Sequence, residues 1–237
     1  MYRLLPLLLI AALPVLAEPP PNTLTGEEKA AGWQLLFDGT STKGWHVIGQ
    51  TSAGTPGWAA VDGELRLRKP EGKTKTLGKD IVTDQEFGDF DLKWEWKIAP
   101  AGNSGLKYNL PDKTKGIGCE YQMIDDAGHP DGKVKGGTHA TASLYDLMAP
   151  APEAKAKPIG EWNESRVTVQ GNHVVEWLNG AKSVEFDFGS EELKKLIDTS
   201  KFKDTKGWGV KTTSPILLQD HGDEVTVRNI KVKAPAR

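Results

Sequence analysis

Glu120 and Gln122 are polar members of a segment, residues 118–126, in which polar and apolar residues alternate. In a strand, Cys119, Tyr121 and Met123 would share one face, and the carboxylate and the amide would share the other, about 7 Å apart. A carboxylate beside an amide on the concave face of a sheet is suited to bind sugar hydroxyl groups. The same alternation also fits two polar residues on a solvated face, so both interpretations stay open.

Lys107 lies in a second expected strand, residues 104–108, which follows a turn rich in glycine and asparagine. It stands between apolar neighbours. Such a lysine is either solvated on an alternating strand or a cation inside a cleft, where it would polarise a carbonyl or an enolate oxygen.

Two histidines stand in polar segments that contain glycine. His139 follows a Gly-Gly pair and precedes Tyr145, which suits a loop beside a cleft. His221 lies in an Asp-His-Gly turn after an apolar strand that ends near Gln219, and backbone geometry there would hold it for proton transfer or metal binding. A structural or merely exposed role is the alternative for both histidines.

Strands must position these residues, and a period of two predicts many of them. In Phe90–Ile98, apolar and charged residues alternate strictly. The last strand, 224–233, changes phase near Asn229, which predicts a bulge. Other expected strands are joined by Asp-Gly, Gly-Asn or Asn-Gly turns, and they are residues 58–61, 64–67, 166–170, 173–178 and 181–186.

Only two short segments of the sequence have a helical pattern. Ser190 would cap a short helix with one apolar face, and residues 25–32 would hold a further turn or two. Many strands, few helices and no internal repeat predict an all-β fold, a two-sheet antiparallel sandwich of jelly-roll type. Residues 31–235 form one expected domain, and 150–158 is a loop at its rim.

Composition excludes several classes of function. The chain has 237 residues, with 30 basic and 32 acidic side chains and a net charge of −2. No basic field exists to hold phosphate backbones, so we expect no nucleic-acid partner. The single cysteine, Cys119, cannot form a disulfide within the chain or build a cysteine-rich zinc site.

Residues 1–17 have the features of a secretory signal peptide. Arg3 supplies a cationic start, Leu4–Leu16 is an apolar run, and the residues around Ala17 suit a cleavage site after it. The run is too short to span a bilayer comfortably, and an uncleaved anchor is the alternative. Residues 18–30 are expected to be a leader, in which residues 18–22 are extended and lie outside the packed structure. We therefore expect a periplasmic or secreted protein with no stable membrane insertion after cleavage.

Short motifs follow one another along nearly the whole chain, from about residue 33 to 233. They are Leu36–Thr40 with Gly44-Trp45, Asn103–Tyr108, Glu120–Asp125, Leu144-Tyr145, Glu161–Asn163, Val175–Gly180, Leu218–Gly222 and Val227–Ile230. Each is weak alone, but the ordered set resembles the 3-keto-disaccharide hydrolase family. The resemblance implies a jelly roll of the concanavalin-A-like lectin and glucanase type.

The resemblance also implies cleavage of glycosides whose sugar carries a ketone at C3. The ketone acidifies the C2 hydrogen, so a base can form an enolate, which expels the C1 substituent, and water can add to the resulting enone. On this basis Glu120 or His221 would be the base, and Lys107 would hold the enolate. A divalent metal is a possible electrophile, but no cofactor is certain.

Further residues are candidates for binding the sugar. Gln122, Tyr145 and Gln219 would fix its hydroxyl groups, and His139 would stand in the same loop cluster. Trp162 or Trp177 would offer a stacking surface. The competing interpretation of both tryptophans is core packing, which we favour for Trp177.

Two departures bear on the function. Asn109 stands where many relatives carry an arginine, so a substrate contact can differ. The acidic E-x-D-x-x-E motif of retaining glucanases is absent, which disfavours glycoside hydrolysis by two carboxylates. A non-catalytic carbohydrate-binding module is the main alternative function, and a structural surface protein is a weaker one.

Overall fold

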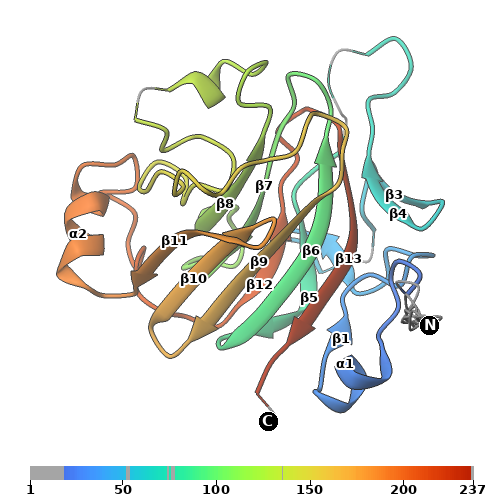
Figure 1. Ribbon diagram of the computed structural model, residues 1–237, viewed down its shortest axis with the longest axis horizontal. Helices are drawn as coiled ribbons and strands as arrows, with labels where there is room; N and C mark the ends of the chain where they lie inside the picture. Colours follow the sequence, from blue (N-terminus) through green and yellow to red (C-terminus); the bar gives the residue numbers. More distant parts are fainter. Residues whose placement is uncertain (1–18, 52–53, 74, 76–77, 135, 236–237) are drawn as a thin grey trace, which may run out of the picture.

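Two antiparallel sheets pack face to face and form the body of the protein (Figure 1). The computed structural model describes residues 19–51, 54–73, 75, 78–134 and 136–235. The larger sheet runs in the order β11 (Ala181–Asp187), β10 (His173–Leu178), β9 (Asn163–Gln170), β6 (Phe90–Ile98), β13 (Val225–Lys233), β4 (Glu64–Leu67) and β3 (Trp58–Val61), with β1 (Gln34–Leu35) also on β13. The smaller sheet runs in the order β2 (Trp45–Val47), β5 (Ile81–Phe87), β12 (Ser214–Leu218), β7 (Asn103–Tyr108) and β8 (Cys119–Ile124). The expected all-β jelly-roll sandwich is thus confirmed.

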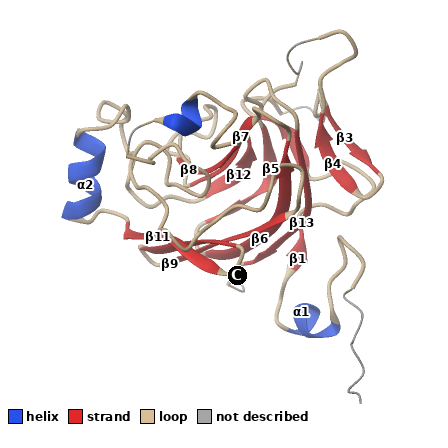
Figure 2. Ribbon diagram, turned by 45° about the horizontal axis from the view of Figure 1, so that its top comes forward, coloured by secondary structure: helices blue, strands red, loops and turns tan. Residues whose placement is uncertain are grey.

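The described helices are short and lie outside the two sheets (Figure 2). They are α1 (Gly26–Ala30), the 3-10 helix η1 (Asp131–Lys133) and α2 (Glu191–Asp198). The expected cap of α2 is present, because Ser190 Oγ accepts a hydrogen bond from Leu193 N–H at 3.1 Å. Among the residues that the structure describes, no helix is long and apolar enough to cross a membrane.

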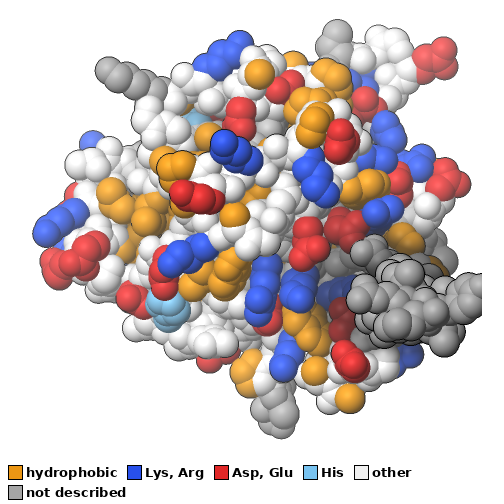
Figure 3. Space-filling view, in the orientation of Figure 1, with side chains coloured by type: hydrophobic (Ala, Val, Ile, Leu, Met, Phe, Trp, Pro, Cys, Tyr) orange, Lys and Arg blue, Asp and Glu red, His pale blue; other side chains and the backbone are white. Residues whose placement is uncertain are grey.

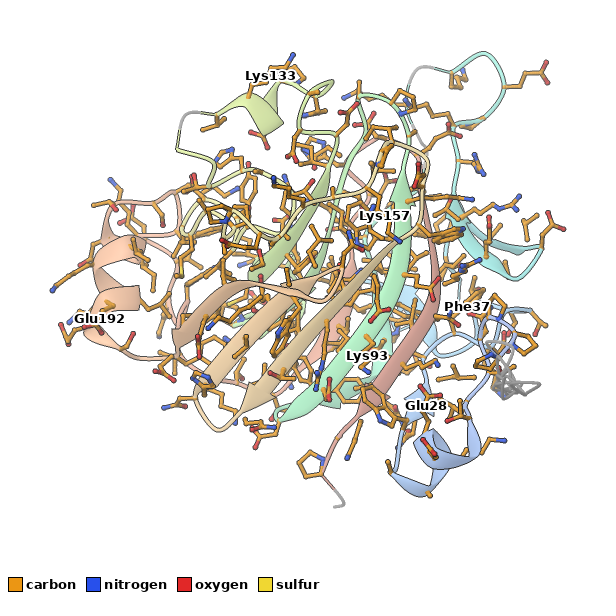
Figure 4. All side chains as sticks on the ribbon, viewed as in Figure 1. Glu28, Phe37, Lys93, Lys133, Lys157 and Glu192 are labelled. Atoms are coloured by element: carbon orange, nitrogen blue, oxygen red, sulfur yellow. The ribbon has the colours of Figure 1, made fainter. Side chains whose placement is uncertain are left out.

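Strands with a single clear period match the sequence prediction. In β6, the apolar residues are buried and the charged residues between them face outward, among them Lys93, which Figure 4 labels. Asp62 and Gly63, which join β3 to β4, both have positive φ, as a tight hairpin turn requires. In β13, the register with β6 shifts between Arg228 and Lys231, which confirms the predicted bulge.

The core between the sheets holds large aromatic side chains and a short polar chain. Trp94 of β6 meets Tyr121 of β8 edge to face, with ring centroids 4.9 Å apart. Trp96 Nε1–H donates to Ser165 Oγ at 2.8 Å, and the serine hydroxyl donates to Tyr121 Oη at 2.8 Å. These contacts tie the inner face of the larger sheet to the back of β8, whose other face carries Glu120 and therefore stands on a rigid support.

Glu176, rather than Trp177, occupies the inward phase of β10. Trp177 lies on the outer face of the larger sheet, with the Arg166 guanidinium 5.0 Å from its ring centroid, where Figure 3 shows basic and acidic side chains interspersed. The expectation that Trp177 packs in the core is therefore wrong. Apolar residues occupy both phases of this strand, and Tyr108 Oη–H gives the buried carboxyl a partner by donating to Glu176 Oε1 at 2.6 Å.

The end of the expected leader is packed against the domain, so the expectation that residues 18–22 lie outside the packed structure is wrong at Asn22. Asn22 is buried, its N–H donates to Asn229 Oδ1 at 2.5 Å, and its Oδ1 accepts the Asn229 N–H at 2.9 Å. Asn22 Nδ2 also donates to Gly63 O at 2.7 Å. Asn229 is the bulge residue and has a positive φ, and in this conformation its N–H and Oδ1 are directed to Asn22. The predicted signal peptide, residues 1–17, lies outside the described residues.

Candidate active site

Lys107 of β7 and Glu120 of β8 are cross-strand neighbours on the outer face of the smaller sheet. Lys107 Nζ lies 3.2 Å from Glu120 Oε2 and donates to Gly116 O at 2.9 Å. The two residues are only 7% and 6% exposed, which excludes the interpretation of both as solvated strand residues. Burying two charges is costly unless each has partners, so a paired lysine and glutamate in a cavity wall are typical of a functional site.

Gly105 makes room for the glutamate. A Cβ at this position would lie 2.6 Å from Glu120 Oε1, which is closer than Cβ atoms approach other atoms. The Glu120 side chain therefore extends over the backbone of Gly105, which pairs with Gln122 on the same face of the sheet. A side chain at position 105 would have to displace the Glu120 carboxylate.

Two glutamines stand on either side of this glycine. Gln122 pairs with Gly105 across β7 and β8, and Gln219 N–H donates to Gly105 O at 3.0 Å from the other side. Gln122 is 1% exposed, yet within the described part of the chain its Oε1 and Nε2 have no hydrogen-bond partner, and neither has Gln219 Oε1. Each unpaired buried polar group costs about 1–3 kcal/mol, a cost that a bound hydroxyl group would remove.

Asp80 adds a second carboxyl group to this charged cluster. Its Oδ1 accepts the Asp220 N–H at 2.9 Å, and its Oδ2 lies close to the Gly116 backbone. Burial raises the pKa of Asp80, the positive charge of Lys107 opposes that shift, and the negative charge of Glu120 adds to it. Asp80, Lys107 and Glu120 thus lie close enough for their charges to act on one another.

The long connection from β8 to β9 builds a wall beside this pair. It includes η1, where Figure 4 labels Lys133, and Figure 2 shows its loops gathered beside β8. Tyr145 N–H donates to Glu120 O at 3.0 Å, and the tyrosine hydroxyl donates to Asp131 Oδ2 at 3.0 Å. His139 stacks on the tyrosine ring at 4.2 Å. The hydrogen bond from Tyr145 N–H thus fixes this wall directly to the strand that carries Glu120.

His139 is held between two carboxylates. Its Nδ1 lies 2.7 Å from Asp131 Oδ1, and its Nε2 lies 2.9 Å from Asp146 Oδ1. Each ring nitrogen therefore already has a carboxylate oxygen as its partner. Burial alone would raise the pKa of either aspartate, but hydrogen bonds from His139 and others leave both lowered. His139 therefore positions the wall, since neither nitrogen is left for a substrate.

A cavity of about 320 Å³ opens beside the pair. Lys107 and Glu120 line it from the sheet, Ile117 lines it from the loop between β7 and β8, and Lys201 and Phe202 line it from the segment after α2. The cavity thus has a charged floor and a partly apolar rim, and its volume suits a small ligand.

His221 lies outside this cavity lining, exposed, beside His129 with ring centroids 5.9 Å apart. With Asp223 the two histidines have the spacing of a metal site. Asp131 N–H donates to His129 Nδ1 at 3.1 Å, and His129 Nε2 lies 3.9 Å from Asp223 Oδ2. None of these three clustered residues is among those that line the cavity beside Lys107 and Glu120.

The sequence matches the family described as the 3-keto-alpha-glucoside-1,2-lyase-like domain over residues 32–233. The chain belongs to this family. The match covers both sheets from just before β1 to the end of β13, so the resemblance seen in the sequence motifs is confirmed along nearly the whole described structure.

Known members and structures support this membership. A 3-keto-disaccharide hydrolase of Bacteroides thetaiotaomicron is 32% identical over 231 residues, which cover 86% of this chain and 79% of that protein. A crystal structure of a candidate glycosyl hydrolase from Parabacteroides distasonis is 34% identical, with a TM-score of 0.77, and covers 91% of this chain and all of that one. A second candidate glycosyl hydrolase from the same organism, 23% identical with a TM-score of 0.63, shares the fold and covers 85% of this chain and 98% of its own.

The fold does not bring every candidate residue to the pair. Trp162 lies against cations of the larger sheet, with Lys97 Nζ 4.5 Å and the Arg228 guanidinium 4.0 Å from its ring centroid. This places the indole on the opposite side of the sandwich from Lys107 and Glu120. Asn109 fixes a loop, because its Nδ2 donates to Val210 O at 3.0 Å and its Oδ1 accepts the Thr212 N–H.

Sequence reasoning missed Asp80 and Lys201. Asp80 stands just before β5, a strand whose pattern we did not single out, and nothing local distinguishes it from a turn aspartate. Lys201 follows α2 in a lysine-rich stretch that reads as solvated surface. Only the packing of distant elements brings both residues to the pair, so no local motif could have identified them.

Proposed function

We propose that this family member cleaves glycosides whose sugar carries a ketone at C3. The observation that supports the proposal best is the buried Lys107–Glu120 pair, with 3.2 Å between Nζ and Oε2, in the wall of a cavity. The family relationship and the Bacteroides relative named as a 3-keto-disaccharide hydrolase point to the same substrate class.

The pair supplies a base and a cation at adjacent positions. Glu120 removes the proton at C2, which the neighbouring ketone makes acidic, and the electron pair moves toward the C3 oxygen. Lys107 stabilises the resulting enolate, because its ammonium is fixed before the charge develops. The enolate expels the C1 substituent, and water adds to the enone to give the free 3-keto sugar.

The two glutamines bind the hydroxyl groups of the sugar. Each amide offers a donor and an acceptor, both glutamines hold unpaired polar atoms, and Gln122 stands two residues from Glu120 in β8. Binding at these buried groups would discriminate strongly against a sugar that lacks the matching hydroxyl, since the amides would then stay unpaired.

Turnover of 3-keto-trehalose, with trehalose as the comparison substrate, tests this function. Mass spectrometry should detect glucose and 3-keto-glucose from the oxidised substrate only. In D2O, the 3-keto substrate should also gain deuterium at C2, which reports the first proton transfer alone. Glu120→Gln should lower both rates by at least about 100-fold, while the exposed Glu153→Gln should change neither.

Two further results distinguish the proposed function from its alternatives, a base at His221 and a carbohydrate-binding module. His221→Gln should leave C2 exchange within about twofold of the unchanged protein, because His221 lies outside the cavity lining. A loss as large as that of Glu120→Gln would move the base to His221. Binding of 3-keto-trehalose without exchange or cleavage would instead support a carbohydrate-binding module.

A further inference from the structure

The segment that follows α2 places a second lysine at the cavity. Lys201 N–H donates to Asp146 Oδ2 at 2.7 Å, which anchors the backbone to the wall described above. Phe202 N–H donates to Ser200 Oγ at 3.0 Å, and the Phe202 ring stacks on Trp208 with centroids 4.9 Å apart. These contacts hold the turn from both sides, so the root of the Lys201 side chain is fixed.

The Lys201 ammonium lies against aromatic rings, and Lys201 and Glu120 line the same cavity. Its Nζ lies 3.9 Å from the Tyr145 ring centroid and 5.0 Å from that of Phe202. Within the described parts of the chain, no carboxylate oxygen lies within 4 Å of it. Lys201 is exposed by its accessible surface, but the protein atoms around its amine partly desolvate it and lower its pKa; Lys107 adds to this shift, and the charges of Glu120 and nearby aspartates oppose it. The amine therefore releases its proton more readily than an ordinary lysine.

The two lysines of the cavity differ in what they are free to do. Lys107 is already engaged by Glu120 Oε2 and Gly116 O, which suits a fixed cation that stabilises charge. Lys201 rests on the face of Tyr145, an arrangement that holds the ammonium without consuming its N–H groups in strong hydrogen bonds. Elimination needs both roles, because the departing C1 oxygen must gain a proton while the enolate oxygen is held.

We propose that Lys201 is the acid that protonates the leaving oxygen at C1, an inference that rests on the proposed function. Glu120 takes the C2 proton, the C1–O bond breaks, and the ammonium of Lys201 gives its proton to the departing oxygen. The enone, a protonated Glu120 and a neutral Lys201 amine remain. Water then adds to C1 as its proton passes to the amine, and C2 recovers a proton from Glu120. Atoms and charges balance, and both residues return to their starting states.

Substrates with different leaving groups test this role. Glucose needs a proton to depart from 3-keto-trehalose, whereas 4-nitrophenolate leaves 4-nitrophenyl 3-keto-glucoside as a stable anion. Lys201→Met should lower kcat on 3-keto-trehalose by about 100-fold and on the nitrophenyl substrate by less than about fivefold. Lys201→Arg should behave like Lys201→Met, because an arginine keeps the charge but does not release a proton. Lys203→Met, exposed two residues along, is the matched control and should change neither rate.

Deuterium exchange at C2 separates this role from the proposed function. The Lys201 variants should still exchange C2 at about the rate of the unchanged protein, which also shows that they are folded. Equal losses on both substrates, or rescue by Lys201→Arg, would overturn the acid role while the proposed function stands. An unchanged protein that neither exchanges nor cleaves would overturn the proposed function and this role together.

Discussion

A single carboxyl group in the core makes the stability of the sandwich depend on pH. Glu176 is fully buried, and burial raises its pKa from 4.5 to about 8, although the hydrogen bond from Tyr108 opposes the shift. Between these values the folded protein holds the proton that the unfolded chain releases. This contribution to stability is therefore complete below pH 4.5 and is lost as the pH rises to about 8.

Glu176→Gln should remove this dependence. Urea unfolding from about pH 5 to about pH 8 should show the unchanged protein losing about 3–4 kcal/mol relative to the variant. Glu164→Gln, on the exposed end of β9, is the control and should keep the slope of the unchanged protein. Parallel slopes for all three proteins would show that the buried carboxyl is not protonated.

Gly105 should matter for catalysis more than for folding. In Gly105→Ala, the new Cβ would compete for space with Glu120 Oε1, so the base would move away from the sugar. We expect kcat on 3-keto-trehalose to fall at least about tenfold while the melting temperature changes little. Gly26→Ala, whose Cβ would meet no atom within 4 Å in α1, serves as the control. Full activity of Gly105→Ala would contradict the tight placement of Glu120.

Residue patterns alone predicted the faces of strands but not their partners. Alternation placed Glu120 and Gln122 opposite the apolar residues of β8, and the structure confirms that placement. It could not show that Lys107 stands across from Glu120, because that pairing depends on the register of two strands. In β10 both phases are apolar, so the pattern could not show that Glu176 rather than Trp177 turns inward.

At the scale of elements, the connection from β8 to β9 should loosen in acid. His139 bridges Asp131 and Asp146, and both aspartates have pKa values below the ordinary 3.8. Acids with lowered pKa stabilise the fold above their ordinary pKa, and this stability is lost as the pH falls through the lowered value. Amide hydrogen exchange in residues 129–146 should therefore rise below about pH 3.8, before exchange in β9 and β10.

Asp146→Asn gives the matched comparison for this segment. It keeps the size of the side chain but removes the charge that faces His139 Nε2 and the carboxylate oxygen that accepts the Lys201 N–H. Exchange in residues 129–146 should rise in this variant already at neutral pH. Exchange that rises uniformly across the protein would instead indicate global acid unfolding without a local role for His139.

Elements with one strong local signal were the predictable part of the fold. The strict alternation of β6, the Asp-Gly turn between β3 and β4, and the phase change in β13 each have a local physical cause. The order of the strands, and the approach of the segment after α2 to β8, have no such local cause in the sequence. The cavity is therefore a property of tertiary packing, and its second lysine could not be found from the sequence.

At the scale of the whole molecule, Asn22 attaches the N-terminal segment of the described chain to the larger sheet. Its backbone and side chain bind Asn229 in the last strand and Gly63 in the β3–β4 turn, so the start of the described chain joins two distant parts of the larger sheet. We propose that export removes residues 1–17, which would leave this connection intact. Mass spectrometry of the exported protein should then find Glu18 as the first residue, and an intact residue 1 in the periplasm or medium would contradict the cleavage.

The contacts of Asn22 also predict how far the N-terminal segment can be shortened before the protein loses stability. A chain that begins at Glu18 should melt at the temperature of the exported protein, because every contact of Asn22 remains. A chain that begins at Leu24 loses those contacts, so the N–H and Oδ1 of the half-buried Asn229 lose their Asn22 partner while its Nδ2 keeps Glu95, at a cost of about 0.5–1.5 kcal/mol for each hydrogen bond lost. Asn22→Ala in the longer chain should reproduce most of that loss in melting temperature. Because Asn22 binds the larger sheet, whereas Lys107 and Glu120 stand on the outer face of the smaller sheet, turnover well below the melting temperature should stay unchanged. A parallel loss of activity would show that this end of the sandwich also shapes the site.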